Sequence, residues 1–384
     1  MTLTQFLKTG LVAVLAFTAF ATIAEAGPPD CDAKPNHPKC QTGGEDPEDP
    51  PQSVADAFWM HPDVVAAHAY WKGVGTQITV IDDFYSSNLI SGRLENDGKL
   101  GVITDRTHGQ WTSLMAYLVA PDAAKRNVDW NVDDPLTWSS SKFDAVNLSY
   151  GLITRNRFAS SYDNWANLGD PHKSVLDAVN GDLALAVQAA GNDGNDVAVG
   201  DSVKGQVDVF SQQFVRIIKG EGDLAGDTFA GDGSFTYMSP IIFAGALQWN
   251  PDGLEGDAID GVTGQESIAS YSTVAGLDPD IQNHFLVVGV EGGRTSTDEF
   301  ANYGSECGSV DNGTCLYGTS FAAPIVTGYA AIVADKFDNP APSLVAHQLL
   351  STATEDTIIG YSPEIHGQGE ASLSLALSPV SISY

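Results

Sequence analysis

Positive charge is scarce in this sequence, in which 18 lysines and arginines stand against 49 aspartates and glutamates. The formal net charge is -31 at pH 7, and loss of the first 26 residues would not change it because Lys8 and Glu25 cancel. Phosphate groups are repelled by such a chain, so we expect it to bind neither nucleic acid nor an anionic membrane surface. A solvated acidic surface explains the charge better than a specific cationic partner does.

Long apolar runs are absent after the first 26 residues, so no later segment is a candidate for a bilayer span. Those first residues contain the basic Lys8, the apolar stretch LVAVLAFTAFATI and the sequence AEA before Gly27, which is typical of a cleaved secretory signal. A signal anchor is the alternative, but the stretch is short for a span. We therefore predict a secreted protein, extracellular or periplasmic, whose mature chain begins near Gly27.

Cysteine is also scarce, and its four positions form two close pairs, Cys31 with Cys40 and Cys307 with Cys315. In an exported chain such pairs favour two small disulfide loops. A metal site is the alternative, but no histidine or cysteine spacing of the zinc type joins either pair. We therefore expect the two disulfides.

Apolar residues make up 43% of the chain, enough for a sizeable core, but they are unevenly distributed. Residues 27–53 are rich in Pro, Gly, Asp and Glu and are predicted to form a tether, because they cannot bury enough apolar surface to fold. Residues 54–384 are predicted to form the folded domain. Within it, we interpret the Gly- and Asp-rich segment from about 193 to 264 as surface excursions with a strand or two, including SPIIFAGALQ.

Strands and helices alternate along this domain. QITVIDDFY, FDAVNLSYG and LALAVQAAGNDG have the composition of short buried strands, whereas THGQWTSLMAYLVA and HKSVLDAVN have helical spacing. Such alternation predicts a mostly parallel sheet with helices on both faces, an α/β fold. Near the end of the chain, SLVAHQLLSTA is predicted to form a closing helix.

The segment GTSFAAPIVTG places a single serine, Ser320, before a run of small apolar residues. Pro324 is compatible with a helix that starts at or just after Ser320, since proline is tolerated in a first helical turn. Ser320 would then lie at the positive end of a buried helix. This position suits a nucleophile and equally suits a capping serine.

Three further polar residues stand where strands end or helices begin: Asp82 after ITVI, His108 in HG, and Asn192 in AAGNDG. A serine attacks well only when a histidine removes its proton and a carboxylate holds that histidine. A side-chain amide can stabilise the oxygen that becomes negative in the intermediate. Each residue alone has a commoner structural role, but the order Asp, His, Asn, Ser along one chain indicates a catalytic set.

Together these motifs resemble the subtilase family of subtilisin-like serine proteases. The resemblance rests on VID at 80–82, HG at 108–109, NLSYG at 147–151, AAGN at 189–192 and GTSFAAPIVTG at 318–328. It implies a three-layer α/β/α fold and hydrolysis of peptide bonds through an acyl-enzyme. It also implies that Ser320 is the nucleophile, His108 the general acid and base, Asp82 the orienting acid and Asn192 the oxyanion donor.

The resemblance further implies where a peptide or protein substrate would bind. Ser149, Tyr150 and Gly151 would lie beside the substrate backbone as an added strand, and Ala189, Ala190 and Gly191 would line the first specificity pocket. The chemistry needs no cofactor, and we expect a monomer. Many members of the family bind calcium; for the acid-rich segments NDGNDVAVGD and DGSFTYMSPIIF, a structural calcium site and a merely solvated surface both stay open, and the second is favoured.

Several positions depart from the family pattern. Asp83 and Phe84 replace the usual small residue and glycine, so a second acid stands beside Asp82. Strand alternation favours Asp82 as the orienting acid, since it shares a face with Ile78 and Val80 while Asp83 points the other way. In addition, HG is followed by QW, and residues 27–53 are too few for the folded inhibitory propeptide that many subtilases carry.

These departures leave one alternative function, a secreted peptide-binding pseudoenzyme with a subtilase fold. All four expected catalytic side chains are present, which favours the enzyme. The related acid peptidases with a Ser-Glu-Asp set use glutamate in place of histidine. His108 and Asn192 count against that class.

Overall fold

The structure is a computed structural model that describes residues 61–92, 104–131, 134–151, 153–154, 169–194, 197, 207–220, 239–249, 266–290, 316 and 318–383. The predicted signal segment, the tether and both cysteine pairs lie outside the described residues. So do most of residues 193–264. The predictions for those segments therefore stay predictions.

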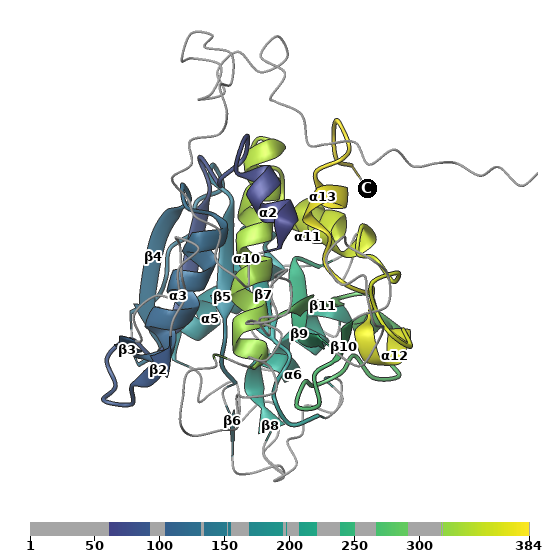
Figure 1. The fold of residues 1–384 in the computed structure, drawn as a ribbon. Coiled ribbons are helices and arrows are strands. Elements are labelled where there is room, and N and C mark those ends of the chain that lie inside the picture. Colours follow the sequence, from purple (N-terminus) through teal and green to yellow (C-terminus); the bar gives the residue numbers. More distant parts are fainter. Residues whose placement is uncertain are drawn as a thin grey trace, which may run out of the picture.

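A seven-stranded, mostly parallel sheet forms the centre of the molecule (Figure 1). Five strands follow one another in parallel: β4 (Ala124–Asp129), β1 (Gln77–Asp82), β5 (Asp144–Leu148), β7 (Leu185–Ala189) and β9 (Ile241–Trp249). The parallel strand β11 (Phe285–Gly289) and the antiparallel strand β10 (Glu266–Ile268) both pair with β9. Two small antiparallel sheets of two strands each lie apart from this sheet: β2 (Ile90–Gly92) with β3 (Thr104–Arg106), and β6 (Ile153–Thr154) with β8 (Val207–Asp208).

Helices cover both faces of the sheet, which confirms the predicted three-layer α/β/α fold. Two long helices, α3 (His108–Val119) and α10 (Thr319–Lys336), pack on one face, together with α2 (Pro62–Ala67), α11 (Pro342–Ser351) and α13 (Leu373–Ala376). The second face packs against α5 (Asp170–Asn180) and α6 (Val209–Ile218). The short helices α7 (Pro279–Gln282) and α12 (Pro363–His366) lie beside β11.

The interior strands β5 and β7 are largely apolar because both of their faces are buried. Every residue of β5 and β7 is buried, and alternate side chains enter two separate clusters. In β1, Ile78 and Val80 pack in the cluster beneath α10, whereas Ile81 packs in the cluster beneath α5. This pattern is the one expected of a parallel sheet between two helical layers.

One sequence interpretation was wrong. SPIIFAGALQ is not a surface strand: it forms β9, an interior strand in which residues 241–247 are buried. The helix α6 was also missed, although Phe210, Phe214 and Ile217 recur at helical spacing and are buried. The surrounding Gly- and Asp-rich residues masked both signals in the sequence.

The helix predicted from GTSFAAPIVTG is α10. It begins at Thr319, one residue before Ser320, so Pro324 is its sixth residue and lies in the second turn. Proline has no N–H to offer the carbonyl of Ser320, and that carbonyl loses its helical partner. Further along, a Cβ atom on Gly328 would come within 2.4 Å of Val119 Cγ1, so glycine is what allows α10 and α3 to cross closely.

The chain direction brings the predicted polar residues to one edge of the sheet. β1, β5 and β7 are parallel neighbours, so their carboxyl ends meet there, and α3 and α10 pack across the same strands. In open parallel sheets this edge is where sites form. No helix among the described residues is both long and apolar enough to cross a bilayer.

Candidate active site

Asp82 and His108 form a hydrogen-bonded pair at this edge. Asp82 ends β1 and is fully buried, and His108 is the first residue of α3. Nδ1 of His108 lies 2.8 Å from Oδ1 and 3.0 Å from Oδ2 of Asp82. Because a carboxylate only accepts, Nδ1 carries the proton and Nε2 is left as the acceptor of the neutral ring.

Two further donors complete the environment of the Asp82 carboxylate. The backbone N–H of Asp83 donates to Oδ1 at 2.7 Å, and the hydroxyl of Thr112, one turn into α3, donates to Oδ2 at 2.9 Å. A buried carboxylate is costly unless its oxygens accept hydrogen bonds. Thr112 was not singled out from the sequence, where it is only a polar residue on a predicted helix.

Asp83, the second acid, is turned away from this pair. Its Oδ1 accepts the backbone N–H of Ser86 at 2.9 Å, and its carbonyl accepts the N–H of Gly109 at 2.9 Å. A Cβ atom on residue 109 would lie only 2.8 Å from that carbonyl oxygen. The glycine of the HG motif is therefore required by the close approach of α3 to the end of β1.

His108 is held in place by the cap of its own helix. Thr107 accepts the N–H of Gln110 at 3.3 Å, and the Gln110 side chain accepts the N–H of Thr107 at 3.1 Å. This is a capping box, which satisfies two backbone donors that would otherwise lack partners. Gln110, one of the departures from the family pattern, thus has a structural role here.

The electrostatic surroundings favour the charged form of the His108 ring. Burial acts to lower its pKa, but the hydrogen bond and charge of Asp82, with a further contribution from the charge of Asp83, outweigh burial and raise the pKa above its ordinary value. The neutral ring, which alone can take a proton, therefore becomes the major form only at a pH above this raised pKa. Any reaction that uses His108 as a base should speed up as pH rises through it.

Ser320 is the second residue of α10 and is half-buried. Its hydroxyl donates to the carbonyl of Ser149, 2.9 Å away. The next residue, Phe321, has its ring centroid 6.1 Å from that of His108, so the start of α10 lies beside the Asp82 and His108 pair. Among the described hydrogen bonds none joins Ser320 to His108, and the hydroxyl would have to rotate away from Ser149 to reach the ring.

Asn192 is exposed and is tied to the start of α10 through Thr319. Its Oδ1 accepts both the backbone N–H of Thr319, at 2.9 Å, and the Thr319 hydroxyl, at 3.1 Å. The Thr319 hydroxyl also accepts the N–H of Gly191 at 3.0 Å. With Oδ1 occupied in this way, the amide NH₂ is the group of Asn192 that remains to donate.

Two glycines with positive φ make this junction. Gly191 has a φ of 115° and Gly318 a φ of 119°, values that other residues rarely adopt. A Cβ atom on Gly318 would meet Nδ2 of Asn192 at 3.3 Å, and one on Gly191 would meet Thr273 Oγ1 at 2.7 Å. The close approach of Asn192 thus explains the glycine in GTS, and the close approach of Thr273 explains the glycine in AAGN.

The residues expected to bind substrate follow β5 and β7. Ser149 and Tyr150 are buried and Gly151 is exposed, while Ala189 and Ala190 are buried and Gly191 is half-buried. The Tyr150 ring turns into the second face, where it meets Trp130, His172 and Phe210 edge-on. Tyr150 can therefore offer its backbone groups, but not its ring, to the sheet edge.

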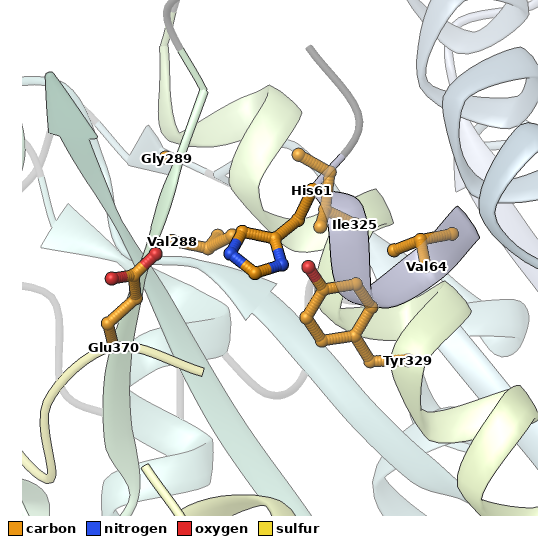
Figure 2. A pocket seen from close by; sticks show the side chains of 7 residues that line it. All are labelled: His61, Val64, Val288, Gly289, Ile325, Tyr329 and Glu370. Atoms are coloured by element: carbon orange, nitrogen blue, oxygen red, sulfur yellow. The ribbon is translucent and has the colours of Figure 1, made fainter. Parts of the chain in front are cut away.

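A separate small cavity lies away from this edge, between α2, α10 and β11 (Figure 2). It is lined by His61, Val64, Val288, Gly289, Ile325, Tyr329 and Glu370. None of the predicted site residues is among them. Within the described parts of the chain there is also no group of three or more His, Cys, Asp or Glu side chains that could hold a metal ion.

Comparison with protein families gives a clear match. The model of the subtilase family matches residues 113–369, more than half of the chain. This range includes Asn192 and Ser320 but begins after Asp82 and His108. No curated protein matches the chain by sequence.

Solved structures to which the chain is similar include the prenylagaramide maturation protease PagA and MycP1 from Mycobacterium smegmatis. PagA is 16% identical, with 83% of this chain and 98% of that chain covered and a TM-score of 0.45. MycP1 is 15% identical, with 88% and 90% covered and a TM-score of 0.44.

The charge balance around His108 can be tested by NMR titration of its ring. We expect His108 to titrate above its ordinary pKa in the wild type, and we expect Asp83→Asn to lower that pKa, because one nearby negative charge is removed while an acceptor for the Ser86 N–H is kept. His172, whose pKa burial lowers to about 4, serves as an internal reference. Titration of His108 below its ordinary pKa would mean that burial outweighs Asp82.

Proposed function

Because the chain belongs to the subtilase family, we propose that it is a secreted serine endopeptidase that hydrolyses peptide bonds of proteins through an acyl-enzyme on Ser320. The observation that carries the proposal is the hydrogen bond between the buried Asp82 and the half-buried His108, at the sheet edge where α10 begins with Thr319 and Ser320. That arrangement joins an orienting acid, a base and a hydroxyl, the three groups that nucleophilic catalysis by serine requires.

In the proposed reaction, the Ser320 hydroxyl turns from the Ser149 carbonyl toward Nε2 of His108. Nε2 takes the proton as Oγ attacks the scissile carbonyl carbon, and Asp82 stabilises the resulting imidazolium through Nδ1–H. His108 then gives the proton to the leaving amine as the peptide bond breaks. A water molecule attacks the acyl-enzyme by the same route, releases the acid product and restores Ser320.

The negative oxygen of each tetrahedral intermediate needs a donor, and we assign this role to the Asn192 amide. Its Oδ1 is held by Thr319, the residue that precedes Ser320, so the NH₂ group is oriented relative to the nucleophile before substrate binds. The N-terminus of the 18-residue helix α10 adds a positive partial charge at the same place. Every proton transfer in this scheme uses only protein groups, substrate and water.

We propose that the protein acts outside the cytoplasm, as a monomer, on protein or peptide substrates. The basic and apolar composition of residues 1–26 supports export, and the net charge of -31 fits a protein that stays soluble without binding nucleic acid or membrane. The alternative of a peptide-binding pseudoenzyme shares every one of these features except turnover. Measurement of turnover therefore separates the two.

Ser320→Ala and His108→Ala should each abolish peptide hydrolysis while the fold is kept, because the two residues act as one unit. The expected loss in kcat is on the order of 10⁶, a magnitude taken from subtilisin itself. Ser343→Ala is the matched control: Ser343 also stands in the first turn of a helix, but its hydroxyl donates to Asp182, which is not one of the proposed site residues. A double variant much slower than either single one would contradict this assignment.

Asn192→Ala should lower kcat and leave KM nearly unchanged, because its donor is needed only when the oxygen becomes negative. The expected loss is about 10²–10³ in kcat, again the magnitude known from subtilisin. Asn339→Ala is the control, since Asn339 holds a turn at the far end of α10 by accepting the Phe143 N–H at 3.2 Å and should affect only melting temperature. A stable Asn192→Ala enzyme with normal kcat would refute the oxyanion role.

A further inference from the structure

Gln188 is a polar residue in an otherwise apolar strand. The other four residues of β7 are Leu185, Ala186, Val187 and Ala189, and all five side chains are buried. Nε2 of Gln188 donates to the Tyr150 carbonyl at 2.8 Å and also lies 3.2 Å from the carbonyl of Ala189. One amide group therefore connects the two segments that we expect to line the substrate site.

Gln188 lies where the pairing of β5 with β7 stops. Parallel pairing of β5 with β7 ends at Leu148 and Gln188. Beyond that point the chains continue as Ser149–Gly151 and as Ala189–Gly191, without further ladder pairs between them. The Gln188 side chain thus supplies a link at the place where the backbone ladder stops.

Gln188 also determines which way the backbone of the Ser149–Gly151 segment faces. The Ser149 carbonyl points to Ser320, whose hydroxyl donates to it at 2.9 Å. The next carbonyl, that of Tyr150, points to Gln188. Because the Gln188 amide holds the Tyr150 carbonyl, the Ser149 carbonyl on the opposite edge of the segment stays directed toward Ser320.

The Gln188 amide is only partly satisfied. Its Oε1 is buried without a hydrogen-bond partner among the described residues, and such an atom carries a desolvation cost. An apolar residue of similar length would avoid that cost, but it would leave the buried Tyr150 carbonyl without the Nε2 donor. Buried polar groups that are only partly satisfied call for an explanation outside packing.

We propose that Gln188 is a positioning residue that sets the distance between the Ser149–Gly151 and Ala189–Gly191 segments, and thereby the affinity for extended peptide substrates. This inference rests on the proposed peptidase function. Gln188 does not touch the reacting atoms, so its contribution is to the binding of substrate residues that contact both segments. Loss of such binding raises KM and leaves the chemical step largely intact.

The test compares Gln188→Met with wild type on two substrates, a peptide with four residues before the scissile bond and the small ester p-nitrophenyl acetate. For the peptide we expect KM to rise about tenfold and kcat to stay within about twofold, since one hydrogen bond of moderate strength is lost. Ester hydrolysis, which needs no extended contact, should be unchanged. The control is Gln348→Met on helix α11, which removes a similar buried bond from Gln348 Nε2 to the Ala376 carbonyl, 3.0 Å long.

An unchanged KM in Gln188→Met, or an equal rise in Gln348→Met, would overturn the positioning role. If Gln188→Met does not fold, Gln188→Leu is measured in its place, and failure of both to fold while Gln348→Met folds would also overturn it. Absence of peptide hydrolysis by the wild type has a different meaning. It would refute the proposed function itself, and this inference with it.

Discussion

The hydrogen bond between the buried carboxylate of Asp82 and the half-buried ring of His108 is the constraint on which the rest of the site depends. A fully buried carboxylate must be surrounded by donors, and here three side-chain or backbone groups supply them. To deliver His108 and Thr112 from one helix, α3 must begin directly above the end of β1. That approach leaves room only for glycine at position 109, whose N–H in turn binds the Asp83 carbonyl.

A second junction joins the end of β7 to the start of α10. Thr319 holds both Gly191 and Asn192, so the end of β7 and the start of α10 cannot move independently. Ser320 follows Thr319 directly, and Phe321 lies against the His108 ring. The two junctions therefore meet at the start of α10, where the Ser320 hydroxyl donates to the Ser149 carbonyl and has to turn from it toward His108 in the proposed reaction.

Much of this arrangement could be predicted from the sequence because it depends on local rules. Alternation of strands and helices predicted the layered parallel fold. Period-two alternation in VIDD favoured Asp82 over Asp83 as the orienting acid, and Asp82 is the one of the two that is hydrogen-bonded to His108. The interior strand β9 was placed on the surface instead, because its apolar run is flanked by Gly- and Asp-rich residues whose composition indicates loops. The helix start at Thr319 was missed by one residue, since proline in the second turn is tolerated when neighbouring packing compensates.

The contacts that could not be predicted all join residues distant in the sequence. Nothing in the sequence indicates that Thr112 binds Asp82 or that the Ser320 hydroxyl rests on Ser149, since both depend on how a helix sits on the sheet. Gln188 did leave a signal, a single amide within an apolar strand, but its partner Tyr150 becomes apparent only from the register of β5 with β7. A single polar residue within a buried strand is thus the sequence feature that indicates such a contact.

The central claim is that Asp82, through His108, activates Ser320, and the rate of covalent labelling by a fluorophosphonate measures this directly. Mass spectrometry should locate the label on Ser320 in the wild type. Asp82→Asn should slow labelling severely, because the amide cannot hold His108 in the required tautomer, whereas Asp83→Asn should slow it little, since Asp83 does not bond to the ring. Labelling that is slowed by Asp83→Asn and preserved in Asp82→Asn, or that occurs at a residue other than Ser320, would contradict the account.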